Sequence, residues 1–98
     1  MPIKWSALKV SEAMDMVEEC IDGGADPLER AKLVAVEARR IPNLPQYVDQ
    51  RLVHLISDIE RMDYVKSAIR AVRESLPGGA VEEERKRVES GRQLSFVA

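Results

Sequence analysis

Four carboxylates near the start of the chain have the residue type and the spacing that could bind a metal ion. They are separated by three, four and three positions, so they share one face of a predicted helix: Glu12, Asp15, Glu19 and Asp22. Di-iron carboxylate bundles combine such residues with Glu-x-x-His motifs on neighbouring helices, and the sequence contains no such motif. We therefore predict no metal ligand here. The stripe is interpreted as a solvated acidic face, with docking of a basic partner protein as the alternative.

The single histidine and the single cysteine do not suggest a catalytic site. His54 lies one helical turn before Asp58, which predicts a pair at the surface. Cys20 lies beside Ile21 and is expected to pack as a small apolar residue. The spacing motifs of zinc sites are absent. No catalytic residue, cofactor or metal is predicted, and the chain is interpreted as non-enzymatic.

The composition indicates one small helical domain. The 98 residues are 45% hydrophobic and 33% charged, and only 4% are aromatic, which argues against a core built from sheets. The net charge of -2 provides no general attraction to nucleic acid or to an anionic membrane, so neither is an expected partner. With one cysteine, no run of 18 apolar residues and no apolar signal in residues 1–10, a cytoplasmic location is expected.

The stretch Leu44–Leu76 has the longest helical pattern. Its apolar residues recur every three or four positions, which predicts one stripe along a helix: Val48, Leu52, Leu55, Ile59, Met62, Val65, Ile69, Val72 and Leu76. The step from Met62 to Val65 is three where a strict heptad has four, which indicates a local overwinding. No Gly or Pro lies between Gln46 and Leu76, so we predict one uninterrupted helix of roughly 45 Å.

Two shorter helices are predicted before it. The first begins near Ser11 and ends at Gly23-Gly24. The second begins at Asp26-Pro27, where Glu29 completes a capping box, and runs to about residue 40. Leu33 and Val36 lie opposite the main apolar face of this second helix, and a helix that is apolar on two sides is usually covered twice.

The two ends of the chain are predicted to differ in role. Trp5 is expected to close one end of the bundle. Pro77-Gly78-Gly79 ends the long helix, and residues 81–90 form a charged short helix that Gly91 closes. In the tail, Leu94 and Phe96 alternate with polar residues, as in a short strand or an extended docking peptide. The predicted division is a helical bundle domain at 1–77 and a charged short helix with an apolar-tipped tail at 78–98.

Together these patterns predict an all-α fold, a small helical bundle in which two shorter helices pack on one long helix, as a dimeric bundle. The predicted function is a small oligomerisation or protein-interaction (adaptor) module that forms a homodimer along the long helix. The predicted interface consists of Val48, Leu52, Leu55, Ile56, Ile59, Met62, Val65, Ile69, Val72, Leu33 and Val36. The alternative is a DNA-binding regulator, because the two shorter helices and their four-residue turn have the dimensions of a helix-turn-helix.

Overall fold

The computed structural model describes the backbone of residues 5–23 and 27–97 and the side chains of residues 5–23 and 28–89. This part of the chain forms α1 (Ala7–Asp22), α2 (Pro27–Ala38), α3 (Gln46–Arg61), α4 (Val65–Glu74) and α5 (Ala80–Val97). It contains no strand. The all-α prediction is therefore confirmed.

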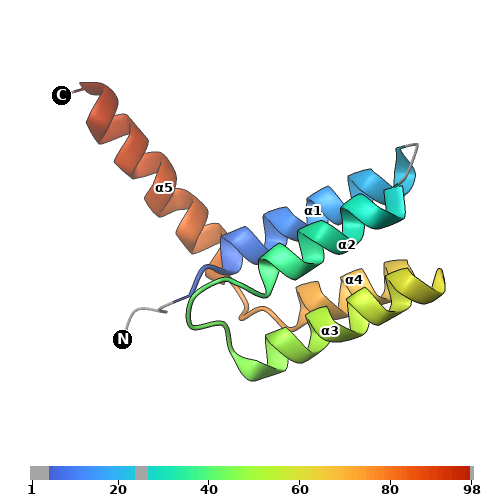
Figure 1. The fold of residues 1–98 in the computed structure, drawn as a ribbon. Helices are drawn as coiled ribbons and strands as arrows, with labels where there is room; N and C mark the ends of the chain where they lie inside the picture. The colour runs from blue at the N-terminus through green and yellow to red at the C-terminus, as the bar shows by residue number, and fades with distance from the viewer. Residues whose placement is uncertain (1–4, 24–26, 98) are drawn as a thin grey trace.

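The first four helices form an antiparallel bundle (Figure 1). Helix α1 packs on α2 and α4, and α3 packs on the same two helices from the other side. Each helix thus lies beside its neighbour in the sequence, and α4 closes the ring onto α1, as in an up-and-down bundle. Among the described helices, α5 packs on α1 alone and projects from one end of the bundle.

The predicted long helix is a helical hairpin. Helix α3 ends at Arg61, and Met62 adopts a left-handed conformation with φ 57° and ψ 39°. The Met62 N–H donates to the Ile59 carbonyl at 3.1 Å, and the Asp63 N–H donates to the Asp58 carbonyl at 3.0 Å. These two bonds are a Schellman motif. The prediction of one continuous helix, with two shorter helices packed on it, is therefore wrong, because α4 turns back along α3.

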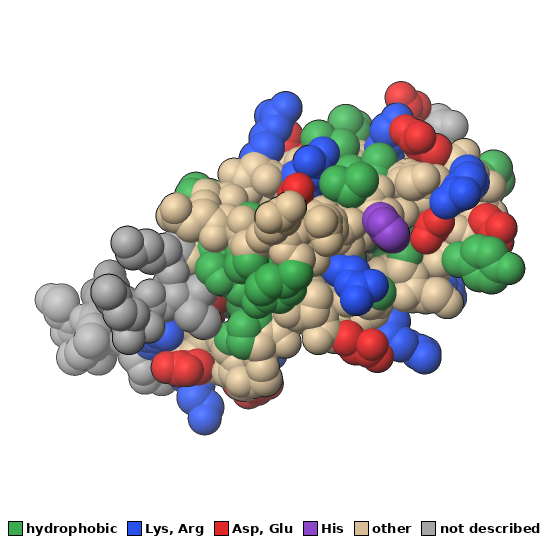
Figure 2. Space-filling model, turned by 90° about the horizontal axis from the view of Figure 1, so that it is seen from below, with side chains coloured by type: hydrophobic (Ala, Val, Ile, Leu, Met, Phe, Trp, Pro, Cys, Tyr) green, Lys and Arg blue, Asp and Glu red, His purple; other side chains and the backbone are tan. Residues whose placement is uncertain are grey.

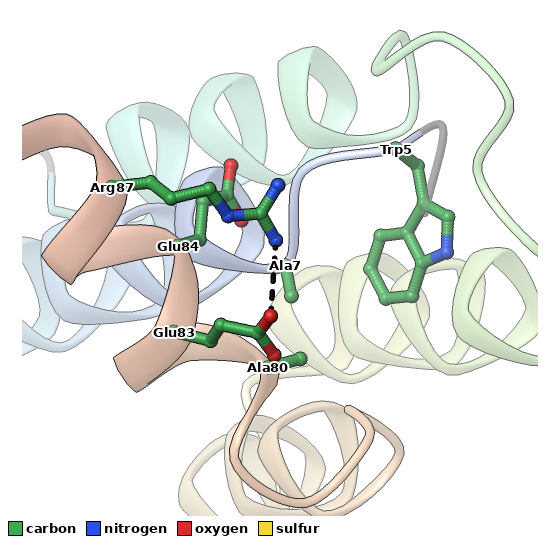
Figure 3. A pocket seen from close by; sticks show the side chains of 6 residues that line it. All are labelled: Trp5, Ala7, Ala80, Glu83, Glu84 and Arg87. Carbon is green, nitrogen blue, oxygen red and sulfur yellow. Dashed lines mark hydrogen bonds and ion pairs between the residues drawn. The ribbon is translucent and has the colours of Figure 1, made fainter. Parts of the chain in front are cut away.

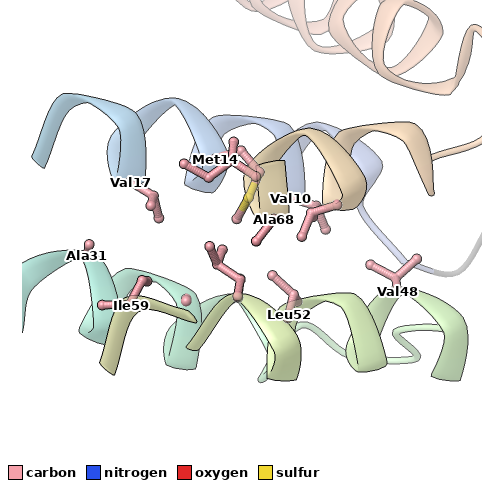
Figure 4. Packing of buried hydrophobic residues seen from close by; sticks show 13 residues of the cluster. Val10, Met14, Val17, Ala31, Val48, Leu52, Ile59 and Ala68 are labelled. Atoms are coloured by element: carbon pink, nitrogen blue, oxygen red, sulfur yellow. The ribbon is translucent and has the colours of Figure 1, made fainter. Parts of the chain in front are cut away.

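The hairpin buries six of the nine stripe residues within one chain. Its residues face those of α1 and α2 in a single core: Val10, Met14, Val17, Ala31, Ala35, Ala38, Val48, Leu52, Leu55, Ile59, Ala68, Ile69 and Val72. Figure 4 shows these side chains pointing toward one another from all four helices. Trp5 packs against this cluster, as predicted for the bundle end.

Helix α2 contributes only alanines to the fully buried core. Ala31, Ala35 and Ala38 recur at helical spacing and are at most 4% exposed. Beyond the helix, the Arg39 side chain binds both carboxylate oxygens of Asp49, with Nε–Oδ1 at 2.8 Å and Nη2–Oδ2 at 3.2 Å. This hydrogen-bonded pair raises the pKa of Arg39 and connects the end of α2 to the start of α3.

Two predicted helix boundaries differ from the observed ones. Helix α1 begins at Ala7 rather than near Ser11, because the Ser6 side chain caps it and accepts from the Lys9 N–H at 3.1 Å. Helix α5 continues through Gly91 to Val97, so the predicted extended tail is helical. Helix α2 begins at Pro27 as predicted, while its expected cap Asp26 lies outside the described residues.

Candidate interaction surface

The residues considered for catalysis or metal binding do not converge. His54 lies exposed on α3, and Figure 2 shows it (purple) among side chains of both charges. The carboxylate of Asp58 pairs with Arg61 at 3.1 Å. Cys20 is half-buried against the core, as predicted. In the part of the chain that the structure describes, no three His, Cys, Asp or Glu side chains are grouped so that they could hold a metal ion.

The acidic face of α1 has a basic partner within the same chain. Arg73 of α4 binds Asp15 at 2.6 Å and also contacts the carboxylate of Glu18. One turn of α1 later, Lys66 of α4 lies 3.4 Å from Asp22. These pairs neutralise Asp15 and Asp22 of the predicted stripe and the neighbouring Glu18, and they join α4 to α1. Glu12 and Glu19 make no ion pair within the described residues.

A small pocket of about 80 Å³ lies where α5 meets the start of α1 (Figure 3). It is lined by Trp5, Ala7, Ala80, Glu83, Glu84 and Arg87. Its charged groups have partners within the chain. Glu83 pairs with Arg87 at 3.5 Å, and Glu84 accepts hydrogen bonds from the Ser6 hydroxyl and the Leu8 N–H. We interpret this pocket as a structural joint that fixes α5 to the bundle.

An apolar opening lies between α1 and α2, and we call it the α1–α2 groove. It has a volume of about 370 Å³ and is lined by Lys9, Glu12, Ala13, Met16, Leu33, Val34, Glu37, Ala38 and Ile41. Two large apolar side chains reach solvent there, since Met16 is 53% exposed and Leu33 is 60% exposed. The groove therefore exposes apolar surface on the side of these two helices that α3 and α4 leave uncovered.

Helical spacing explains how the groove arises. The lining residues of α1 follow a three-four-seven spacing from Lys9. Those of α2 follow the same spacing from Val34 to Ile41, just beyond the helix end, and Leu33 precedes them. These edges lie next to the buried faces that α1 and α2 turn toward the core. Ala13 and Ala38 are small, so the larger side chains at the ends of the groove leave a depression between them.

The structure separates the predicted interface residues into three groups. Six are buried in the core of one chain: Val48, Leu52, Leu55, Ile59, Ile69 and Val72. Three are half-buried: Val36, Ile56 and Val65. Met62 and Leu33 are exposed, but Met62 lies at the α3–α4 turn, and only Leu33 lines the α1–α2 groove.

Sequence reasoning missed Met16 as a surface residue of interest. The sequence signal that points to this surface is the two-sided apolar character of α2, because a helix that is apolar on two sides is usually covered by a second element. Met16 on the neighbouring helix completes the surface that Leu33 begins. The predicted interface along the long helix cannot cover this side of α2. Its central residues are already buried against α4, α2 and α1 of the same chain.

Comparison with known proteins does not assign this surface. No family model matches the chain, and neither the curated proteins nor the solved structures gave a significant match. Within the described residues, every helix is too short or too polar to cross a membrane.

Proposed function

We propose that the chain is a small non-enzymatic protein-interaction module that binds its partner through the α1–α2 groove. The observation that carries this proposal is the exposure of Met16 and Leu33 in one groove lined mainly by apolar side chains. Exposed apolar patches rimmed by polar residues are typical of binding sites. Methionine suits such a surface because its flexible thioether adapts to the shape of a partner.

The alternative, a helix-turn-helix regulator, has no specific support. In that motif the two helices cross at about 90–120°, whereas α1 and α2 lie side by side and antiparallel (Figure 1). The exposed face of α1 also presents the carboxylates of Glu12 and Glu19, which phosphates repel.

A photo-crosslinking amino acid placed at position 33 tests the proposal in the native host. We expect discrete covalent adducts with protein from position 33. The matched control is position 53, because Val53 is also a helical apolar residue at 40% exposure but lies on α3, outside the groove. An absence of adducts at position 33, or the same adducts at both positions, would contradict the proposed function.

A further inference from the structure

We infer that the occupant of the α1–α2 groove is a second copy of this chain, related by a twofold axis. This inference rests on the proposed function and names its partner. The groove offers projecting side chains at Met16, Leu33 and Ile41 and small ones at Ala13 and Ala38. A surface with both projections and depressions can interdigitate with its own copy, as a twofold interface requires.

The charges at the rim also suit pairing with an identical rim. Lys9 and Glu12 line the groove and make no ion pair within the described residues. Glu37 lines it as well and lies 3.3 Å from Arg40. The lining itself carries one positive and two negative groups, and Arg40, which pairs with Glu37 beside the groove, adds a second positive group. A rim of one sign would repel its own copy, whereas a mixed rim can match it.

The area of this face indicates a weak dimer. Helices α1 and α2 have 16 and 12 residues, so they are about 24 and 18 Å long and lie about 10 Å apart. A twofold contact over the pair buries on the order of 1,000 Å² in total, which is near the lower limit for specific association. We therefore expect monomers and dimers to exchange at micromolar concentrations.

Sedimentation equilibrium of the full chain over a concentration series tests this inference. The wild-type mass should rise from 11.0 kDa toward twice that value as concentration increases. Leu33→Glu and Met16→Glu should each weaken association at least about tenfold, while the control Val53→Glu should associate like the wild type. A wild-type chain that stays monomeric, or a Leu33→Glu chain that still dimerises, would overturn the inference.

A charge-reversal pair tests whether the two rims meet. Lys9→Glu with Arg40→Glu gives an acidic rim, and Glu12→Lys with Glu37→Lys gives a basic rim. Each variant alone should remain monomeric, and an equimolar mixture should associate at least as strongly as the wild type. All four side chains are exposed, so circular dichroism should report an unchanged fold. A mixture that does not associate would overturn the inference.

The two proposals fail in different ways. If the wild type is monomeric but position 33 crosslinks to a different protein, the groove is an interaction site and its partner is not a second copy. If position 33 yields no adduct, both proposals fail. If α5 of another copy filled the groove, the two experiments would give a different result. Deleting residues 88–98 would then abolish association, and changes in the rim charges would not control it.

Discussion

The Glu84 carboxylate on α5 accepts a hydrogen bond from the Leu8 backbone N–H on α1, at 2.9 Å. Leu8 is at the second position of α1, where the N–H has no partner within the helix. The Ser6 side chain accepts from Lys9 at the third position. A residue 76 positions away in the sequence therefore completes the cap and places a negative charge at the helix N-terminus.

Glu84→Ala should therefore weaken both α1 and the attachment of α5. We expect a loss of about 1 kcal/mol, the usual contribution of an N-terminal cap. Urea unfolding measures the loss, and amide hydrogen exchange should show faster exchange in α5 than in α3. Glu82→Ala is the control, because Glu82 pairs only with Arg85 on its own helix at 3.8 Å. Equal effects of the two changes would contradict this role of Glu84.

Met62→Gly should stabilise the chain. The Schellman position that Met62 occupies favours glycine, because a side chain in the left-handed region has a steric cost of roughly 1–2 kcal/mol. Met62 is 73% exposed, so little packing is lost with its side chain. We expect a gain of about 1 kcal/mol in thermal or urea unfolding. Glu60→Gly, within α3, should instead destabilise by about 1 kcal/mol, and a loss of stability in Met62→Gly would contradict the observed turn.

The chain reversal between α3 and α4 is the part of the fold that the sequence does not predict. Gly and Pro are the strongest local signals of a helix end, and the turn at Met62–Tyr64 contains neither. Two non-glycine residues adopt positive φ there, 57° at Met62 and 52° at Tyr64. The packing of α4 on α3 favours the turn, and that packing is a tertiary effect. The shortened step from Met62 to Val65 is the one sign of this turn in the sequence, but such a step also fits overwinding within a continuous helix.

The apolar positions themselves were predictable, because helical spacing selects them whichever element covers them. Six of the nine stripe residues are buried in the core of the bundle, whereas Met62 is exposed at the turn. Leu33 is exposed on the side of α2 away from the core. What covers each position depends on where the chain reverses. One continuous helix would leave these residues free to contact a second chain. The observed hairpin instead buries them in the core of one chain.

Leu55→Ala should destabilise the monomer rather than an assembly. Leu55 is fully buried in the core, so removing its side chain should reduce the free energy of unfolding by about 3 kcal/mol. Because the covering side chains belong to the same chain, the unfolding midpoint should change by the same amount at every protein concentration. His54→Ala, at the exposed neighbouring position, is the control and should change stability by less than about 0.5 kcal/mol. A Leu55→Ala effect that disappears at low protein concentration would contradict burial within one chain.

Divalent cations should not bind specifically to the acidic face of α1. Arg73 and Lys66 already neutralise carboxylates there, and a cation would have to displace them. Isothermal titration with Ca²⁺ or Mn²⁺ should give no saturable heat at micromolar concentration. A stoichiometric transition would contradict this expectation and would reopen the question of a metal site.

Arg73→Met should reveal an electrostatic contribution between α4 and α1. Methionine keeps an apolar stem in place but removes the contacts to Asp15 and Glu18. Because the Arg73 side chain is 36% exposed, each contact should contribute less than about 1 kcal/mol, and we expect a total loss of about 1 kcal/mol in dilute buffer. In about 1 M NaCl the loss should shrink, because screening then acts over about 3 Å. Arg61→Met is the control, since its pair with Asp58 lies within one helix. Equal losses for Arg73→Met at low and high salt would show that the side chain acts through packing alone.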